Sequence, residues 1–226
     1  MLTSLFSVDR LITILLRLPA VLLAISVHES AHAWTADKLG DPTGRVTGRI
    51  SINPMRHFDL YGTLCMVLFG FGWAKPVPIN PRNFKDPKKG MAISAAAGPV
   101  SNVLMMLVGI LLERVLEIAF SPVFAAADSP FYMPCAIVLT MVQIFSILNA
   151  SLAVFNLIPV PPLDGSRLLL VFLPQRLYFK LMQYERWIML GMMALLFLGV
   201  LDGPLSFLSG GLYSLGNRLV GLIPFL

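Results

Sequence analysis

Charged residues are scarce in this chain. Only 13% of its 226 residues are Asp, Glu, Lys or Arg, whereas 57% are hydrophobic, and the mean hydropathy is +0.79. A soluble domain has about 25% charged and about half apolar residues, so the composition predicts an all-α polytopic membrane protein instead. The net charge of +5 comes from Lys and Arg gathered in a few loops. That pattern indicates membrane topology and no binding of nucleic acid.

Cysteine is also rare. Cys65 and Cys135 lie 70 residues apart in apolar runs, which excludes a disulfide framework and a thiolate zinc site. A cleaved signal peptide is not expected, because Arg17 interrupts the first apolar run and no A-x-A-like site follows. The first apolar segment is therefore expected to remain as a membrane span.

Apolar runs predict about six membrane segments, since about 20 helical residues cross a hydrocarbon core roughly 30 Å thick. They are expected at about 11–36, 60–73, 91–112, 134–157, 187–201 and 204–224. The run 60–73 is short and lies between basic loops, so we expect it to be re-entrant. The whole chain, 1–226, is expected to be one integral-membrane domain. Its catalytic core lies at about 11–173 and its C-terminal membrane helices at about 184–226.

The stretch GRVTGRISINP, residues 44–54, differs from its surroundings. Val46, Ile50 and Ile52 occur among polar residues and glycines, which favours a strand or hairpin over a helix. Non-helical backbone at membrane depth is tolerated only inside protein or along a wet cavity. We therefore expect a small re-entrant β element over residues 44–73 that forms a cavity wall.

The segment VHESAH contains His28, Glu29 and His32 in the H-E-x-x-H spacing. On a helix the two histidines lie one turn apart on one face, so both can bind one ion about 2.0–2.1 Å from each nitrogen. Glu29 beside them can meet water bound to that ion. Because ionisable residues are costly in a membrane helix, a functional role is favoured over a polar cluster that only holds helices together.

A catalytic zinc site has three protein ligands and an open position for water, so a third ligand is needed. His57 is a candidate, although a surface position near lipid headgroups is favoured for it. Asp164 lies in IPVPPLDGSRLLLVF, between apolar residues. The prolines before it prevent ordinary helix, and Gly165 permits a tight turn that aims the carboxylate from the start of a helix. Taken alone, this stretch favours a helix N-cap for Asp164.

Three motifs together resemble the site-2 protease family of intramembrane zinc metalloproteases, in its compact bacterial branch. They are HESAH in the first helix, AGPVSN (97–102) and FNLIPVPPLDG (155–165). The similarity extends over about residues 20–173, and no PDZ-like or CBS-like regulatory domain accompanies it.

The resemblance implies that His28, His32 and Asp164 bind one zinc ion and that Glu29 is the catalytic acid–base. It also places Asn156 near the metal. In the expected reaction, Glu29 takes a proton from the attacking water and later delivers it to the leaving amine.

Other residues are expected to bind substrate. Asn156 is the first candidate donor to the tetrahedral oxyanion. A strand edge at Ile50 and Ile52 would offer main-chain hydrogen bonds to an extended substrate. Asn102 is a further candidate for substrate binding, although an interhelical hydrogen bond is the favoured role.

The expected substrate is a transmembrane protein or peptide, including signal-peptide remnants, in a multi-pass protein of the cell membrane. The active site is expected nearer the cytoplasmic face, with lipid around the protein. Two alternatives remain open: a metal-ion or proton transporter, and a catalytically inactive escort of membrane proteins. The sequence shows no repeat typical of transporters, and transport gives no reason for Glu29 between the histidines.

Overall fold

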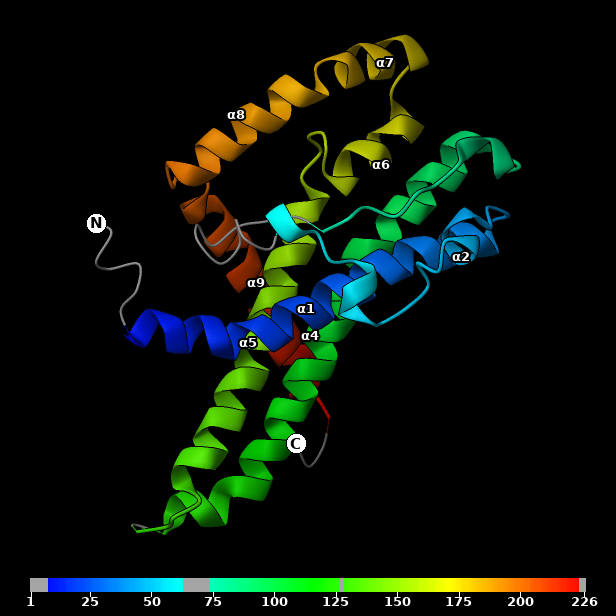
Figure 1. The fold of residues 1–226 in the computed structure, drawn as a ribbon. Coiled ribbons are helices and arrows are strands. Elements are labelled where there is room, and N and C mark those ends of the chain that lie inside the picture. Colours follow the sequence, from blue (N-terminus) through cyan, green and yellow to red (C-terminus); the bar gives the residue numbers. More distant parts are fainter. Residues whose placement is uncertain (1–7, 63–73, 127, 224–226) are drawn as a thin grey trace.

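The computed structural model describes residues 8–62, 74–126 and 128–223. Over these ranges the chain is helical and contains no strand (Figure 1). The α-helices are α1 (Val8–Lys38), α2 (Thr43–Val46), α4 (Pro87–Ala125), α5 (Tyr132–Leu157), α6 (Asp164–Phe172), α7 (Gln175–Gln183), α8 (Glu185–Phe197) and α9 (Asp202–Val220), with 3-10 turns η1 (Pro54–Arg56) and η2 (Pro81–Asn83). The all-helical class expected from the composition is confirmed for the described part of the chain.

Two described helices are long and apolar enough to cross a membrane, Ile12–Lys38 within α1 and Tyr132–Leu157, which is α5. Helices α8 and α9 pass the same test only as a pair bent by 85°, which would make a third crossing. The 13 residues of α8 rise only about 20 Å, so this helix is too short to span by itself. The structure thus gives two or three crossings where about six segments were expected, and most of the run 60–73 lies outside the described residues.

Helix α4 is the centre of the fold. It contacts α1, α5, α6 and α9, and in Figure 1 it runs beside α5 for most of its length. Its start is fixed by Asp86, whose carboxylate accepts hydrogen bonds from the backbone N–H groups of Lys88 and Lys89. Small buried residues along the helix, Gly90, Ala92, Ser94, Ala95 and Gly98, let neighbouring backbones approach closely.

The strand expected at residues 44–54 is wrong. Thr43–Val46 form the short helix α2, Gly48 turns the chain with φ of +68°, and η1 begins at Pro54. A strand needs a paired neighbour, and the described residues provide none beside this stretch. The apolar side chains of Val46 and Ile52 are instead 80% and 70% exposed.

Asp41 joins the end of α1 to the extended segment 74–83. Its carboxylate is fully buried. It accepts hydrogen bonds from the N–H and hydroxyl of Thr43, from the backbone N–H of Asn80 at 2.7 Å, and from the side-chain amide of Asn83 at 2.7 Å. Burial by itself would raise the pKa of Asp41, but these hydrogen bonds outweigh it and hold the pKa below its ordinary value.

Replacing Asp41 by Asn is expected to destabilise the protein by about 1–3 kcal/mol near neutral pH, because buried donors lose their acceptor. Since the folded-state pKa is lowered, the carboxylate stabilises the fold above the unfolded pKa of about 3.9, and this stabilisation is lost as pH falls through the folded pKa. The difference in thermal unfolding between wild type and Asp41→Asn should therefore be full at pH 7 and shrink progressively as pH falls below about 4. Asp128→Asn, at an exposed position, is the control, and an undiminished difference at pH 3 would contradict the assignment.

Candidate metal centre

Three donor atoms converge where α1, α4 and α6 meet. His28 and His32 extend from one face of α1, and Asp164 is the first residue of α6. The Nε2 atoms of the histidines lie 3.0 Å apart, and Asp164 Oδ2 lies 3.1 Å from the first and 3.2 Å from the second. Both histidines are buried, and the aspartate side chain is 13% exposed. Among the described residues, these three form a group whose ligand atoms lie within 4.8 Å of one another.

The remaining nitrogen of each imidazole has a fixed neighbour. His32 Nδ1 lies 2.7 Å from the backbone carbonyl of Ser94, and His28 Nδ1 lies 2.6 Å from Asn102 Oδ1. A carbonyl oxygen only accepts, so Nδ1 carries the hydrogen and Nε2 keeps its lone pair. Both lone pairs then point at the place where the carboxylate oxygen lies.

This arrangement fits a metal ion. Asp164 Oδ2 is buried and has no hydrogen-bond partner among the described atoms. Two neutral imidazoles and a carboxylate are a donor set typical of catalytic zinc. The lone pairs of these three atoms repel one another, and a cation bound between them would remove this repulsion by accepting all three.

The start of α6 aims Asp164 at the histidines. Leu163 occupies the N-cap position, and no side chain caps this helix, so the N-cap role considered for Asp164 is wrong. A Cβ on Gly165 would lie 2.4 Å from the carbonyl oxygen of Leu157 and 2.5 Å from that of Ile158. Glycine is therefore needed here so that α6 can begin directly against the end of α5.

Gly98 closes the site from the side of α4. A Cβ at this position would lie 2.4 Å from His32 Nε2 and 2.5 Å from Cε1 of His28. The backbone of α4 thus touches both imidazoles, which explains the glycine in the AGPVSN stretch. Sequence reasoning did not identify Gly98, nor Ser94, whose contribution is a backbone carbonyl without a side-chain signature.

A cavity of about 470 Å³ opens beside the three ligands. Glu29 of α1 and Asn156 of α5 lie in its wall. Glu29 Oε2 accepts a hydrogen bond of 3.2 Å from the backbone N–H of Val77. Asn156 donates one N–H to the carbonyl of Leu152 at 3.0 Å, which leaves its second N–H for another acceptor.

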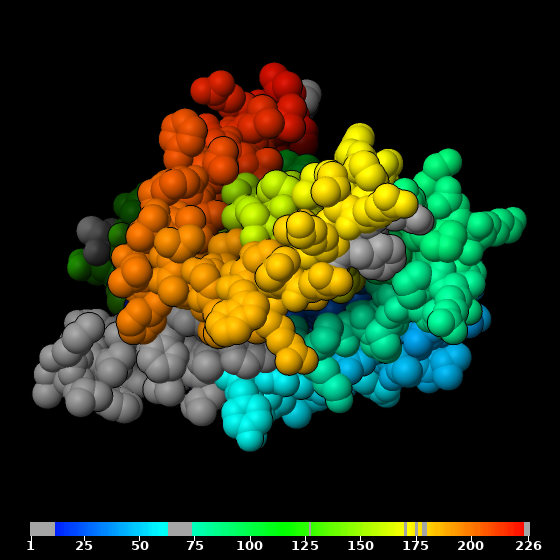
Figure 2. Space-filling model, turned by 90° about the horizontal axis from the view of Figure 1, so that it is seen from above, coloured from blue at the N-terminus to red at the C-terminus, as the bar shows by residue number. Residues whose placement is uncertain are grey.

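The rest of the cavity wall is mainly apolar. The extended segment 74–79 supplies Pro76, Val77 and Ile79, and α8 supplies a stripe of one helical face. That stripe consists of Met189, Met192, Met193 and Leu196. Helices α7 and α8 lie above α6 in Figure 1, and seen from above they cover the middle of the molecule (Figure 2).

Three other candidates lie away from this cavity lining. Asn102 is fully buried and makes interhelical hydrogen bonds, to His28 and to Asn149, which confirms its favoured role. Ile50 and Ile52 do not line the cavity, and the strand on which their substrate-binding role depended is absent from the described residues.

One residue of the cavity wall was not identified from the sequence. Arg167, one turn after Asp164, lines the cavity.

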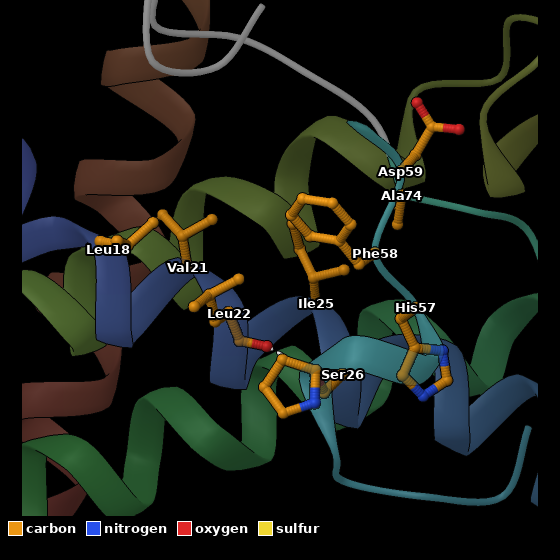
Figure 3. A pocket seen from close by; sticks show the side chains of 10 residues that line it. Leu18, Val21, Leu22, Ile25, Ser26, His57, Phe58, Asp59 and Ala74 are labelled. Carbon is orange, nitrogen blue, oxygen red and sulfur yellow. Dashed lines mark hydrogen bonds between the residues drawn. The ribbon is translucent and has the colours of Figure 1, made fainter. Parts of the chain in front are cut away.

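His57 is also separate from the metal ligands. It lines a small cavity of about 20 Å³ between α1 and residues 54–59 (Figure 3). Its side chain is only 2% exposed, and Nε2 lies 2.7 Å from the carbonyl of Ser51. The surface position favoured for His57 is therefore wrong, and this histidine is a buried residue directly after η1.

Comparison with known proteins agrees with this geometry. The model of peptidase family M50 matches residues 17–199. The chain belongs to peptidase family M50. A Bacillus subtilis (strain 168) protein named "Putative zinc metalloprotease YwhC" is 38% identical to this M50 peptidase over 170 residues, 74% of this chain and 73% of that protein. No solved structure matches the chain. The resemblance to site-2 proteases is confirmed, and the protein is a zinc-dependent membrane metalloprotease.

Gly98→Ala is expected to weaken zinc binding by this M50 peptidase by at least about tenfold, because the new methyl group displaces both imidazoles. Competition of the purified protein with a zinc chelator measures the change. Gly210→Ala in α9 is the matched control, since a Cβ there meets nothing within 4 Å. Wild-type zinc affinity in a folded Gly98→Ala variant would show that the histidines lie elsewhere.

Proposed function

We propose that this M50 peptidase hydrolyses peptide bonds within or near transmembrane segments of membrane proteins, or in signal-peptide remnants. The supporting observation is the depth of the ligands along α1. His28 and His32 lie ten and six residues before Lys38, the last residue of the apolar helix. At 1.5 Å per residue they are about 15 Å and about 9 Å inside it, within a hydrocarbon core about 30 Å thick.

In the proposed reaction one zinc ion per chain is held by His28, His32 and Asp164, and when bound it polarises water and lowers the pKa of that water toward neutral. Glu29 acts as general base on the attacking water and then as general acid toward the leaving amine. Its position in the cavity wall, with one oxygen held by Val77 N–H, supports this role. The second oxygen remains for the proton transfer.

Asn156 is the proposed donor to the oxyanion that forms on the scissile carbonyl. It lines the same cavity as the ligands, and one of its two amide hydrogens is not used by the bond to Leu152. The other N–H can therefore donate without breaking that bond. A donor held in place before the reaction stabilises the developing charge more effectively than a mobile one.

The segment 74–79 is the proposed edge for an extended substrate. Pro76 and Pro78 have no N–H, and the N–H of Val77 is bonded to Glu29. The N–H of Ile79 has no hydrogen-bond partner among the described residues, and its side chain faces the cavity. A substrate unwound from its helix can pair with this backbone without sequence-specific contacts.

We also propose that the chain is one multi-pass domain of the cell membrane with its active site nearer the cytoplasmic face. The ligands lie toward the Lys38 end of α1, and basic residues are frequent in the loops at that end. Arg49 and Lys75 belong to these loops, and Arg45 in α2 and Lys88 at the start of α4 lie next to them in the chain. Clustering of Lys and Arg on the cytoplasmic side, next to anionic lipid, accounts for this distribution.

Glu29→Gln is expected to abolish cleavage of a transmembrane substrate in detergent or liposomes while zinc content stays at about one per chain, because the amide cannot take a proton. Asp164→Ala is expected to lose zinc as well, because one of three ligands is removed. Zinc content and cleavage are measured on the same preparations. Cleavage by Glu29→Gln near the wild-type rate would contradict the proposed mechanism.

A photo-crosslinking side chain at position 79 should capture a transmembrane substrate in the inactive Glu29→Gln background, whereas the same side chain at position 52 should not. Ile79 lines the cavity, and Ile52 lies in the irregular stretch before η1. Crosslinked products are identified by mass spectrometry. Capture from position 52 alone would contradict this proposal and show that residues 44–54 bind the substrate instead.

A further inference from the structure

We propose that Asn149 and Asn102 form a hydrogen-bond relay that sets the tautomer of His28 and thereby prepares its Nε2 for the metal. Both asparagines are positioning residues that touch neither substrate nor metal. The inference rests on the proposed ligation by His28. It is carried by the direction of the hydrogen bonds that connect α5, α4 and α1.

The relay begins on α5. The side-chain amide of Asn149 donates from Nδ2 to the backbone carbonyl of Phe145 at 2.9 Å. Because a carbonyl can only accept, the Asn149 amide has one allowed orientation. Its Oδ1 is consequently turned toward α4.

The orientation of the Asn149 amide fixes that of Asn102 on α4. Its Nδ2 donates to Asn149 Oδ1 at 2.8 Å, so its own Oδ1 must face α1. That oxygen lies 2.6 Å from His28 Nδ1. The histidine nitrogen must therefore carry the hydrogen, and the lone pair is left on Nε2, 3.1 Å from Asp164 Oδ2.

Because the three side chains of the relay are buried, losing one of their hydrogen bonds is costly. Asn102 and Asn149 are both 0% exposed, and His28 is 7% exposed. Water therefore cannot readily replace a lost member, and a broken relay leaves its neighbours without partners. With no acceptor at Nδ1, His28 can place its hydrogen on Nε2 and donate it to the carboxylate of Asp164. That tautomer has no lone pair at the metal position.

His32 provides an internal reference for this proposal. Its Nδ1 bonds to the backbone carbonyl of Ser94, which no side-chain substitution removes. A change at Asn102 or Asn149 should therefore alter His28 and leave His32 as it is. If the asparagines only held the helices together, their loss would lower stability without selecting one histidine.

The first measurement is the tautomer of each histidine in metal-free protein labelled with ¹⁵N-histidine. The chain has only three histidines, so the long-range ¹H–¹⁵N spectrum contains three imidazoles. It is recorded well above the ordinary imidazole pKa of about 6.5, where the rings are neutral. In wild type we expect the hydrogen of His28 on Nδ1. In Asn102→Leu and in Asn149→Leu we expect it to move toward Nε2, with His32 unchanged.

The second measurement is zinc affinity by chelator competition. Asn102→Leu and Asn149→Leu are expected to bind zinc about 10- to 100-fold more weakly, as is usual when a metal-bound histidine loses its outer partner. Ser146→Ala is the matched control, because this buried serine lies one turn before Asn149 and donates only back to Val142 of its own helix. Its affinity should remain within about twofold of wild type.

A rescue separates the relay from packing. A carboxylate at position 102 can only accept from His28, so Asn102→Asp should restore zinc affinity relative to Asn102→Leu. Asn149→Leu should then have no further effect in the Asn102→Asp background. Unchanged His28 tautomer and wild-type zinc affinity in Asn102→Leu would overturn the proposal, as would equal losses in Asn149→Leu and Ser146→Ala. Neither measurement depends on proteolysis, so failure to cleave any substrate would contradict only the proposed function.

Discussion

The fold holds two imidazole nitrogens and one carboxylate oxygen close together, although their lone pairs repel one another. His28 Nε2, His32 Nε2 and Asp164 Oδ2 lie 3.0–3.2 Å apart, and with the imidazole hydrogens on Nδ1 all three present lone pairs to one point. Separate elements hold the three in place. One face of α1 supplies both imidazoles, the turn at Gly165 supplies the carboxylate, and Gly98 lets α4 close against the rings. The buried asparagines behind His28 and the carbonyl of Ser94 behind His32 then orient the ligands, as outer partners do in metal sites generally.

The proposed hydrolysis at lipid depth requires a space for water and a place for irregular backbone. A cavity and a non-helical segment lie on one side of the ligands. The cavity of about 470 Å³ is large enough for several waters and lies between Glu29 and Asn156. Its wall at 74–79 is non-helical, and at the proposed membrane depth such backbone is tolerated only beside a cavity. Three prolines in residues 76–81 reduce the number of N–H groups that need acceptors. Glu29 and Asp41 accept two of the remaining three, so the loop is held at both ends.

The parts predicted from sequence are those with a local signature. The spacing of His28 and His32 is a property of one helix, and the motif resemblance identified Asp164 before the geometry could. The alternation around Ile50 failed as a strand signal because no strand of the described residues pairs with this irregular segment, and its apolar Val46 and Ile52 are exposed. Of the six membrane segments expected, the described residues confirm two or three, and α8 is too short to cross alone because it ends after 13 residues, before Gly199 with φ of +70° turns the chain toward α9. Asn149 and Val77 act through partners 47 or more residues away, which only the tertiary fold brings near.

The two sides of the cavity differ in rigidity. The side that carries the reacting groups is buried and hydrogen-bonded, and the opposite side is not. On the ligand side, side chains of α1, α4 and α5 are buried and bonded across helices, which keeps reacting groups within fixed distances. On the opposite side, α8 has no buried residue and presents three methionines and Leu196. Methionine is flexible and fits apolar surfaces of different shape. Fixed geometry is required for the reacting groups, whereas an adaptable wall suits the varied apolar side chains of the transmembrane substrates that we propose. A single cavity can therefore combine strict chemistry with a permissive substrate surface.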